Sequence, residues 1–212
     1  LTVFDVGSVL TPLGQIMLMI LIQIGGLGIM TFYALVSISL HHRFLSAETQ
    51  ELQAGWSTES LSETFGLVKS IFYVTFGVEL LGAALIFPFI PSDVGGLPQR
   101  LFYALFHAIS AFCNAGFSLF PNSLAIFSSS TWVMIVFSGL IIIGGLGFPV
   151  IFELYHRYIT HKKQRLKLQT KLVLYVTVSL LMIGTVVLFF QSIAGMQSDG
   201  ALMKAFFHSV SA

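Results

Sequence analysis

The best candidate for chemistry in this sequence is a stretch of backbone and not a set of reactive side chains. Cys113-Asn114-Ala115-Gly116 follows a short helix-like stretch, residues 98–112, and lies between two long apolar runs. Gly116 can adopt backbone angles that other residues avoid, so successive carbonyl oxygens can turn to one side. A ring of such carbonyls can replace the hydration shell of a cation. We therefore predict a cation-binding filter made by the backbone carbonyls of Cys113, Asn114, Ala115 and Gly116. The plainer alternative is an outer loop with a glycine turn.

The elements that must position this stretch follow from the composition. The chain has 212 residues, of which 56% are hydrophobic and 9% are charged, and its mean hydropathy is +0.91. A soluble domain carries roughly 25% charged residues, so these values indicate a protein of the lipid membrane. Only helices and closed barrels satisfy their own backbone in hydrocarbon. Because the apolar runs are continuous and do not alternate, we predict an all-α polytopic membrane protein.

Charge and cysteine content exclude other classes. The formal net charge of +1 gives no reason to expect nucleic acid as a partner. The single cysteine, Cys113, allows no internal disulfide and makes no metal-site pattern, and we expect no covalently bound cofactor. The chain opens without Met and stops inside a helix-like stretch, so we expect a fragment of a longer membrane protein.

Four apolar runs have about the ~20 residues that a spanning helix needs. They are residues 13–40, 65–90, 128–155 and 172–190. The stretch 98–112 is different, because as a helix it would cover only ~20 Å of a hydrocarbon core that is ~30 Å thick. It can enter the membrane but cannot cross it. We therefore predict a re-entrant pore loop over residues 98–120.

The distribution of basic residues predicts the orientation. Residues 156–171 hold six of the ten Lys and Arg residues: Arg157, Lys162, Lys163, Arg165, Lys167 and Lys171. By the positive-inside rule this loop is cytoplasmic. Counting spans from it makes 41–64 cytoplasmic as well and puts the mouth of the pore loop, 91–127, on the external face of the cell membrane.

Two internal matches predict a repeated unit. Residues 104–111 align with residues 205–212, which pairs His107 with His208 at an offset of 208 − 107 = 101. A glycine-rich run over residues 24–28 recurs over residues 143–147, at an offset of 144 − 25 = 119. The predicted unit is helix, pore loop, helix, repeated without inversion, which places several loops around one central ion pore. These matches favour the filter over a plain glycine turn.

The predicted organisation has five parts. Residues 1–40 form the end of repeat 1, 41–64 a cytoplasmic linker and 65–158 a complete repeat 2 that contains the pore loop. Residues 159–171 form the basic cytoplasmic loop, and 172–212 the start of repeat 3.

Several polar and small residues inside the apolar runs have two interpretations each. Glu79 is favoured as a structural residue bonded to a neighbouring pore helix or polar group, with ion contact as the alternative. Glu153 is expected to bond a helix terminus or to pair with Arg157. The matched His107 and His208 are expected to hydrogen-bond behind the filter and not to bind the ion, since imidazole suits transition metals better than alkali ions. The glycine clusters are expected to permit close helix packing, with a hinge beside Pro149 as the alternative.

The same residues carry a family resemblance. The stretch 106–120, with Asn114-Ala115-Gly116-Phe117, resembles the second pore loop of the Trk/Ktr/HKT superfamily of potassium transporters. The runs 23–32 and 144–149 look like the ends of the first and second repeats of that family. Leu1-Thr2-Val3-Phe4-Asp5 resembles the segment after the first filter glycine. The pattern is most similar to the pore-forming subunit of the Ktr branch.

This resemblance implies properties that the residues alone do not. It implies four repeats in one chain, a homodimer, and a cytosolic ring of nucleotide-binding regulatory subunits. It implies potassium as the transported ion, with sodium as the alternative. Two other classes are the alternatives, an intramembrane enzyme and a non-conducting scaffold. An enzyme needs a convergent set of polar residues, which the sequence does not offer, and a scaffold does not explain the repeated loops.

Overall fold

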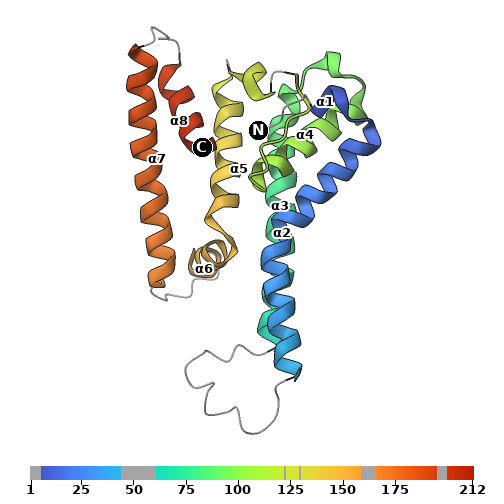
Figure 1. Cartoon of the computed structure of the whole chain (residues 1–212), viewed down its shortest axis with the longest axis vertical. Helices are drawn as coiled ribbons and strands as arrows, with labels where there is room; N and C mark the ends of the chain where they lie inside the picture. The colour runs from blue at the N-terminus through green and yellow to red at the C-terminus, as the bar shows by residue number, and fades with distance from the viewer. Residues whose placement is uncertain (1–5, 44–60, 122, 129, 159–165, 195–199) are drawn as a thin grey trace.

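The computed structural model describes residues 6–43, 61–121, 123–128, 130–158, 166–194 and 200–212. Every regular element within these ranges is helical, which confirms the predicted all-α class. The opening residues 1–5, most of the predicted linker 41–64 and the basic residues 159–165 lie outside the described ranges. The helices, as labelled in Figure 1, are α1 (Val6–Val9), α2 (Pro12–Arg43), α3 (Leu61–Ile86), α4 (Leu97–Phe112), α5 (Thr131–Leu146), α6 (Phe148–Tyr158), α7 (Leu168–Ala194) and α8 (Ala201–Ser211).

Among the residues that the structure describes, two helical segments have the length and apolar character needed to cross a membrane, Ile71–Phe89 and Leu168–Gln191. Shorter apolar stretches are Pro12–Leu27, which is the first part of α2, and Thr131–Leu146. Large apolar side chains along α7 face outward, among them Leu172, Leu180, Ile183 and Phe190. Outward-facing apolar side chains over a whole helix are what a lipid environment requires.

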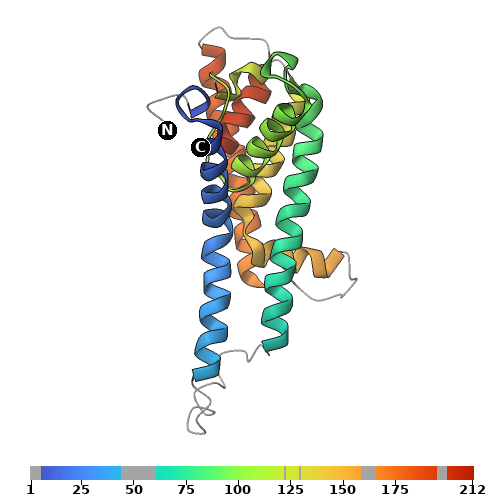
Figure 2. The same ribbon diagram turned by 90° about the vertical axis from the view of Figure 1, so that its right-hand side faces the viewer.

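One of the predicted spans is broken. Residues 128–155 were expected to form a single run, but α5 ends at Leu146 and α6 begins at Phe148. Gly147 between them has a φ of 80° and a ψ of 151°, an extended conformation with positive φ that is essentially restricted to glycine and cannot continue a helix. Pro149 then lacks the N–H that would continue the hydrogen bonding of α5. As a result α6 lies across the axis of α5 (Figures 1 and 2). The prediction of one continuous run over residues 128–155 was therefore wrong. The break at Gly147 fits the alternative interpretation of this glycine cluster, a hinge beside Pro149.

The order helix, short helix, helix recurs along the chain. The short helix α4 packs against α3, and the short helix α8 packs against α7 (Figure 1). In both pairs the short helix starts near the C-terminal end of the long helix that precedes it and runs back beside that helix (Figures 1 and 2). The repeat that the match between His107 and His208 predicts would place α4 and α8 at corresponding positions, and it stays a prediction.

The core of the molecule forms around α4. One apolar cluster joins α4 to α3 and α5 through residues that include Ile86, Ala108 and Phe137. A second joins α4 to α1 and α2 through residues that include Val6, Ile22 and Phe106. The short helix is therefore enclosed by α2, α3 and α5, which holds its end in place.

Candidate cation site at the end of a half-helix

The half-helix α4 stops abruptly, as the sequence predicted. Its 16 residues span ~24 Å, at 1.5 Å per residue, and its second half is buried. The Cys113 N–H donates to the Ile109 carbonyl at 2.9 Å and makes the last helical hydrogen bond. A helix C-terminus carries about −0.5 of a charge. The buried end of α4 is thus a region of negative potential next to residues 113–116.

The backbone of residues 113–116 is neither helix nor strand. Asn114 has a φ of 52° and Gly116 a φ of 71°, so the left-handed conformation occurs at alternate positions. Asn tolerates this conformation and Gly adopts it freely. In the part of the chain that the structure describes, the carbonyl oxygens of Cys113, Asn114, Ala115 and Gly116 accept no hydrogen bond. Four successive unpaired carbonyls next to a helix C-terminus can coordinate a cation.

Ser110 closes the loop from behind. Its hydroxyl donates to the Phe117 carbonyl at 2.7 Å and accepts from the Phe117 N–H at 2.9 Å. The Ala115 N–H donates to the Ser110 carbonyl at 2.9 Å. One serine therefore holds Ala115, inside the stretch that carries the four carbonyls, and Phe117, the residue that follows it. The sequence analysis did not identify this role, although Ser110 is matched by Ser211 in the repeat.

We expect Ser110→Ala to destabilise the loop. The Phe117 N–H would lose its acceptor, and an unsatisfied buried donor costs ~1–3 kcal/mol. Ser138 is a matched control, because both serines are 2% exposed and the Ser138 hydroxyl has no hydrogen-bond partner in the described structure. The midpoint temperature of thermal unfolding in detergent should therefore fall for Ser110→Ala and stay unchanged or rise for Ser138→Ala. Equal behaviour of the two variants would contradict the bridging role of Ser110.

His107 holds the segment that follows. Its Nδ1 lies 2.7 Å from the Tyr103 carbonyl, so Nδ1 carries the proton and donates. Its Nε2 then accepts from the Ser118 hydroxyl at 3.0 Å and from the Leu119 N–H at 3.2 Å. The imidazole also stacks on Phe120, with ring centroids 4.7 Å apart. The predicted role behind the loop is confirmed for His107, while the contribution of Ser118 was missed.

The two glycine clusters meet the end of α4 from different helices. A Cβ on Gly144 would overlap the carbonyl oxygen of Phe112, and a Cβ on Gly26 would overlap the Cys113 sulfur. Gly26 lies in α2 and Gly144 in α5. The predicted close packing is confirmed at both positions, and it occurs directly at the site.

The two buried or interfacial carboxylates also have assigned contacts. Glu79 Oε1 accepts from Gln23 Nε2 of α2 at 3.0 Å, so its predicted bond to a neighbouring polar group is confirmed. Glu153 accepts from the Lys167 N–H at 2.5 Å and from the Thr170 hydroxyl. It thereby caps the start of α7, one of its two predicted roles. Burial alone would raise the pKa of Glu153, but these hydrogen bonds hold it below its ordinary value.

A scaffold of helices with outward-facing apolar side chains around a buried half-helix defines the class of all-α membrane proteins. The comparison with known families is more specific, since the family of cation transport proteins TrkH matches residues 1–212. The chain belongs to this family. The predicted family is therefore confirmed, and its description is that of a transport protein and not of an enzyme.

The curated relatives agree with this family. The Ktr system potassium uptake protein B of Bacillus subtilis is 39% identical over 192 residues, which are 89% of this chain and 42% of that protein. The protein of the same name from Vibrio alginolyticus is 36% identical and covers 100% of this chain and 48% of its own length. The potassium/sodium uptake protein NtpJ of Enterococcus hirae is 36% identical, with 83% of this chain and 38% of that protein covered. The chain thus spans less than half the length of these relatives.

Proposed function

We propose that this chain is part of a potassium uptake protein in which the carbonyls of residues 113–116 form one section of the ion filter. The observation that carries the proposal is the set of four unpaired carbonyls beside the negative end of a buried half-helix. Non-helical backbone at membrane depth is tolerated only where it is buried in protein or lines water. A cation in this position would take the carbonyls as its ligands in place of water.

Potassium is the preferred cargo in this proposal. Two of the relatives are named for potassium uptake and one for potassium and sodium uptake. Sodium is therefore the competing ion. The resemblance in sequence further supports four repeats around one pore, a homodimer and a cytosolic nucleotide-binding regulatory partner. The name "Ktr system" of the first two relatives indicates a system of several components.

The experiment that tests this function uses the full-length protein. It should restore growth at limiting potassium to a bacterial strain that lacks its own uptake systems. Vesicles from these cells should take up rubidium, and unlabelled potassium should compete with rubidium more strongly than sodium does. Absence of growth and of rubidium uptake, with the protein present in the membrane, would refute the proposal.

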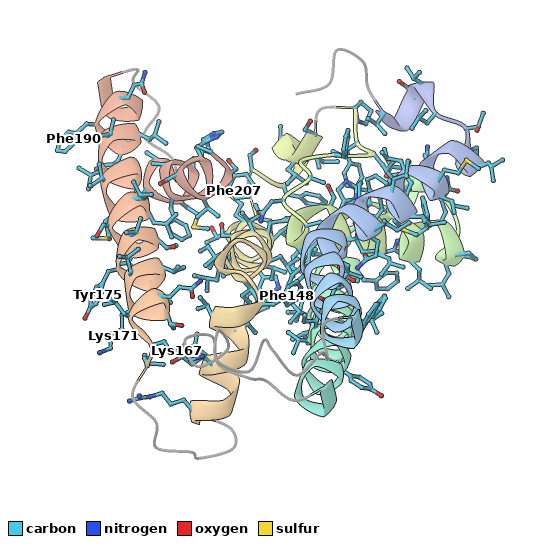
Figure 3. The ribbon with its side chains drawn as sticks, turned by 60° about the horizontal axis from the view of Figure 1, so that its bottom comes forward. Phe148, Lys167, Lys171, Tyr175, Phe190 and Phe207 are labelled. Atoms are coloured by element: carbon cyan, nitrogen blue, oxygen red, sulfur yellow. The ribbon has the colours of Figure 1, made fainter. Side chains whose placement is uncertain are left out.

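We also propose that the basic end of α7 faces the cytoplasm in a multi-pass topology. Figure 3 shows Lys167 and Lys171 at one end of α7, near α6, and Phe190 toward the other end. This end follows the basic stretch of the sequence, which the positive-inside rule assigns to the cytoplasm. A cysteine introduced as Lys163→Cys should react with an impermeant maleimide only after the cells are opened. One introduced as Asp93→Cys should react in intact cells. Labelling in the opposite order would reverse the topology.

A further inference from the structure

Three helices exchange polar contacts at the first residue of the predicted filter. Glu79 from α3 is 1% exposed, and its Oε1 accepts from Gln23 Nε2 of α2 at 3.0 Å. The Cys113 sulfur, at the end of α4, lies 4.0 Å from the same carboxylate oxygen. Gln23 and Glu79 are 56 positions apart in the sequence, and they come from different predicted repeats. This contact therefore ties repeat 1 to repeat 2 at residue 113.

Stability does not explain why these polar side chains are present. Glu79 Oε2 and Gln23 Oε1 are both buried, and neither has a hydrogen-bond partner among the described residues. A half-satisfied buried polar network is less favourable than an apolar core of the same shape. Polar residues at membrane depth that do not stabilise the fold are expected to serve function.

The geometry gives Cys113 two fixed neighbours. Its sulfur touches the Glu79 carboxylate on one side, and on the other it approaches Gly26 so closely that a Cβ there would overlap it. The Cys113 side chain has no space to move toward α2, and its backbone carbonyl is the first of the four unpaired ones. A shift of the side chain would therefore displace that carbonyl.

We propose that Glu79, oriented by Gln23, is a positioning residue that fixes the Cys113 carbonyl and does not itself contact the ion. Its Oε1 is already engaged by Gln23 and faces the Cys113 side chain. The effect on transport rests on the proposed function, whereas the immobilisation of Cys113 does not. The two parts can be tested separately.

The test of immobilisation uses the only cysteine in this chain. In the full-length protein with any other cysteine replaced, Glu79→Leu should raise the rate at which a small thiol reagent labels Cys113. Glu79→Gln keeps a side-chain oxygen that accepts from Gln23, so its labelling rate should stay near that of the parent. Thr75→Val is the matched control, since Thr75 lies one turn earlier on α3, is 0% exposed and has an unpartnered hydroxyl. An unchanged labelling rate in Glu79→Leu would overturn the positioning role.

The test of transport measures the half-saturating rubidium concentration, the maximal rate and the preference for potassium over sodium. Residues that orient ligands typically change affinity about 10- to 100-fold when they are lost, so Glu79→Leu should raise the half-saturating concentration by that order. Gln23→Glu should also impair uptake, and the exchange Gln23→Glu with Glu79→Gln should restore it, because one amide and one carboxylate again face each other. If Glu79 binds the ion directly, Glu79→Gln will fail like Glu79→Leu and the exchange will not restore uptake. Failure of the parent protein to transport would refute the proposed function and leave the labelling result standing.

Discussion

Replacing Gly116 with serine is expected to reduce potassium selectivity more than any other single change in this chain. Gly116 has a φ of 71°, and a side chain in the left-handed conformation costs ~1–2 kcal/mol. The loop can relieve this strain only by turning the peptide that carries an unpaired carbonyl. A free-energy change of ~1.4 kcal/mol corresponds to about tenfold in an equilibrium. The ratio of potassium to sodium uptake in the full-length protein should therefore fall by about tenfold.

Two comparisons isolate the cause. Gly116→Ala adds the strain without a hydroxyl that competes for backbone hydrogen bonds, so its effect on selectivity should be smaller. Gly200 has a similar φ of 68° and nothing near its Cβ position, and it lies at the start of α8, away from residues 113–116. Gly200→Ser should therefore lower stability without changing selectivity. Unchanged selectivity in Gly116→Ser, or an equal loss in Gly200→Ser, would remove Gly116 from the filter.

Replacing Gly144 with alanine should cause the largest loss of stability. The added Cβ would overlap the Phe112 carbonyl oxygen, which is backbone at the end of a buried helix and cannot rotate away. Overpacking a tight core typically costs ~1–3 kcal/mol, and a clash with backbone lies at the upper end of that range. Helix α5 or the end of α4 would have to move, so uptake should fall together with thermal stability.

Gly139 is the matched control for this substitution. It lies in the same helix, and a Cβ there would meet nothing within 4 Å. Alanine stabilises a helix by up to ~1 kcal/mol relative to glycine, so Gly139→Ala should be neutral or stabilising. A stable and active Gly144→Ala variant would show that α5 does not pack against α4 in this way.

The extent of the half-helix was predictable because its determinants are local. Pro98 favours a helix start, and the short apolar stretch ends at the Cys-Asn-Ala-Gly sequence, so the predicted 98–112 lies within one residue of the observed α4. The hydrogen-bonding role of His107 could also be predicted, because its match with His208 singled it out in the sequence. Both inferences needed only spacing and residue type.

The hydrogen bonds behind the loop could not be predicted, because they depend on how the chain returns. Ser110 meets Phe117 and His107 meets Leu119 only once residues 113–116 have turned back along α4. The break at Gly147 was missed for a related reason. Hydropathy continues without interruption through residues 128–155, so a span and a bent pair of helices look alike until the φ of Gly147 is known. The pairing of Gln23 with Glu79 likewise required the packing of α2 on α3.

The central claim is that the carbonyls of residues 113–116 coordinate the transported cation. The most direct measurement is anomalous diffraction from crystals of the full-length protein grown with thallium in place of potassium. We predict a thallium peak on the pore axis, with carbonyl oxygens of Cys113, Asn114, Ala115 or Gly116 among its ligands. Thallium bound elsewhere in the protein, with these carbonyls turned away from it, would contradict the claim.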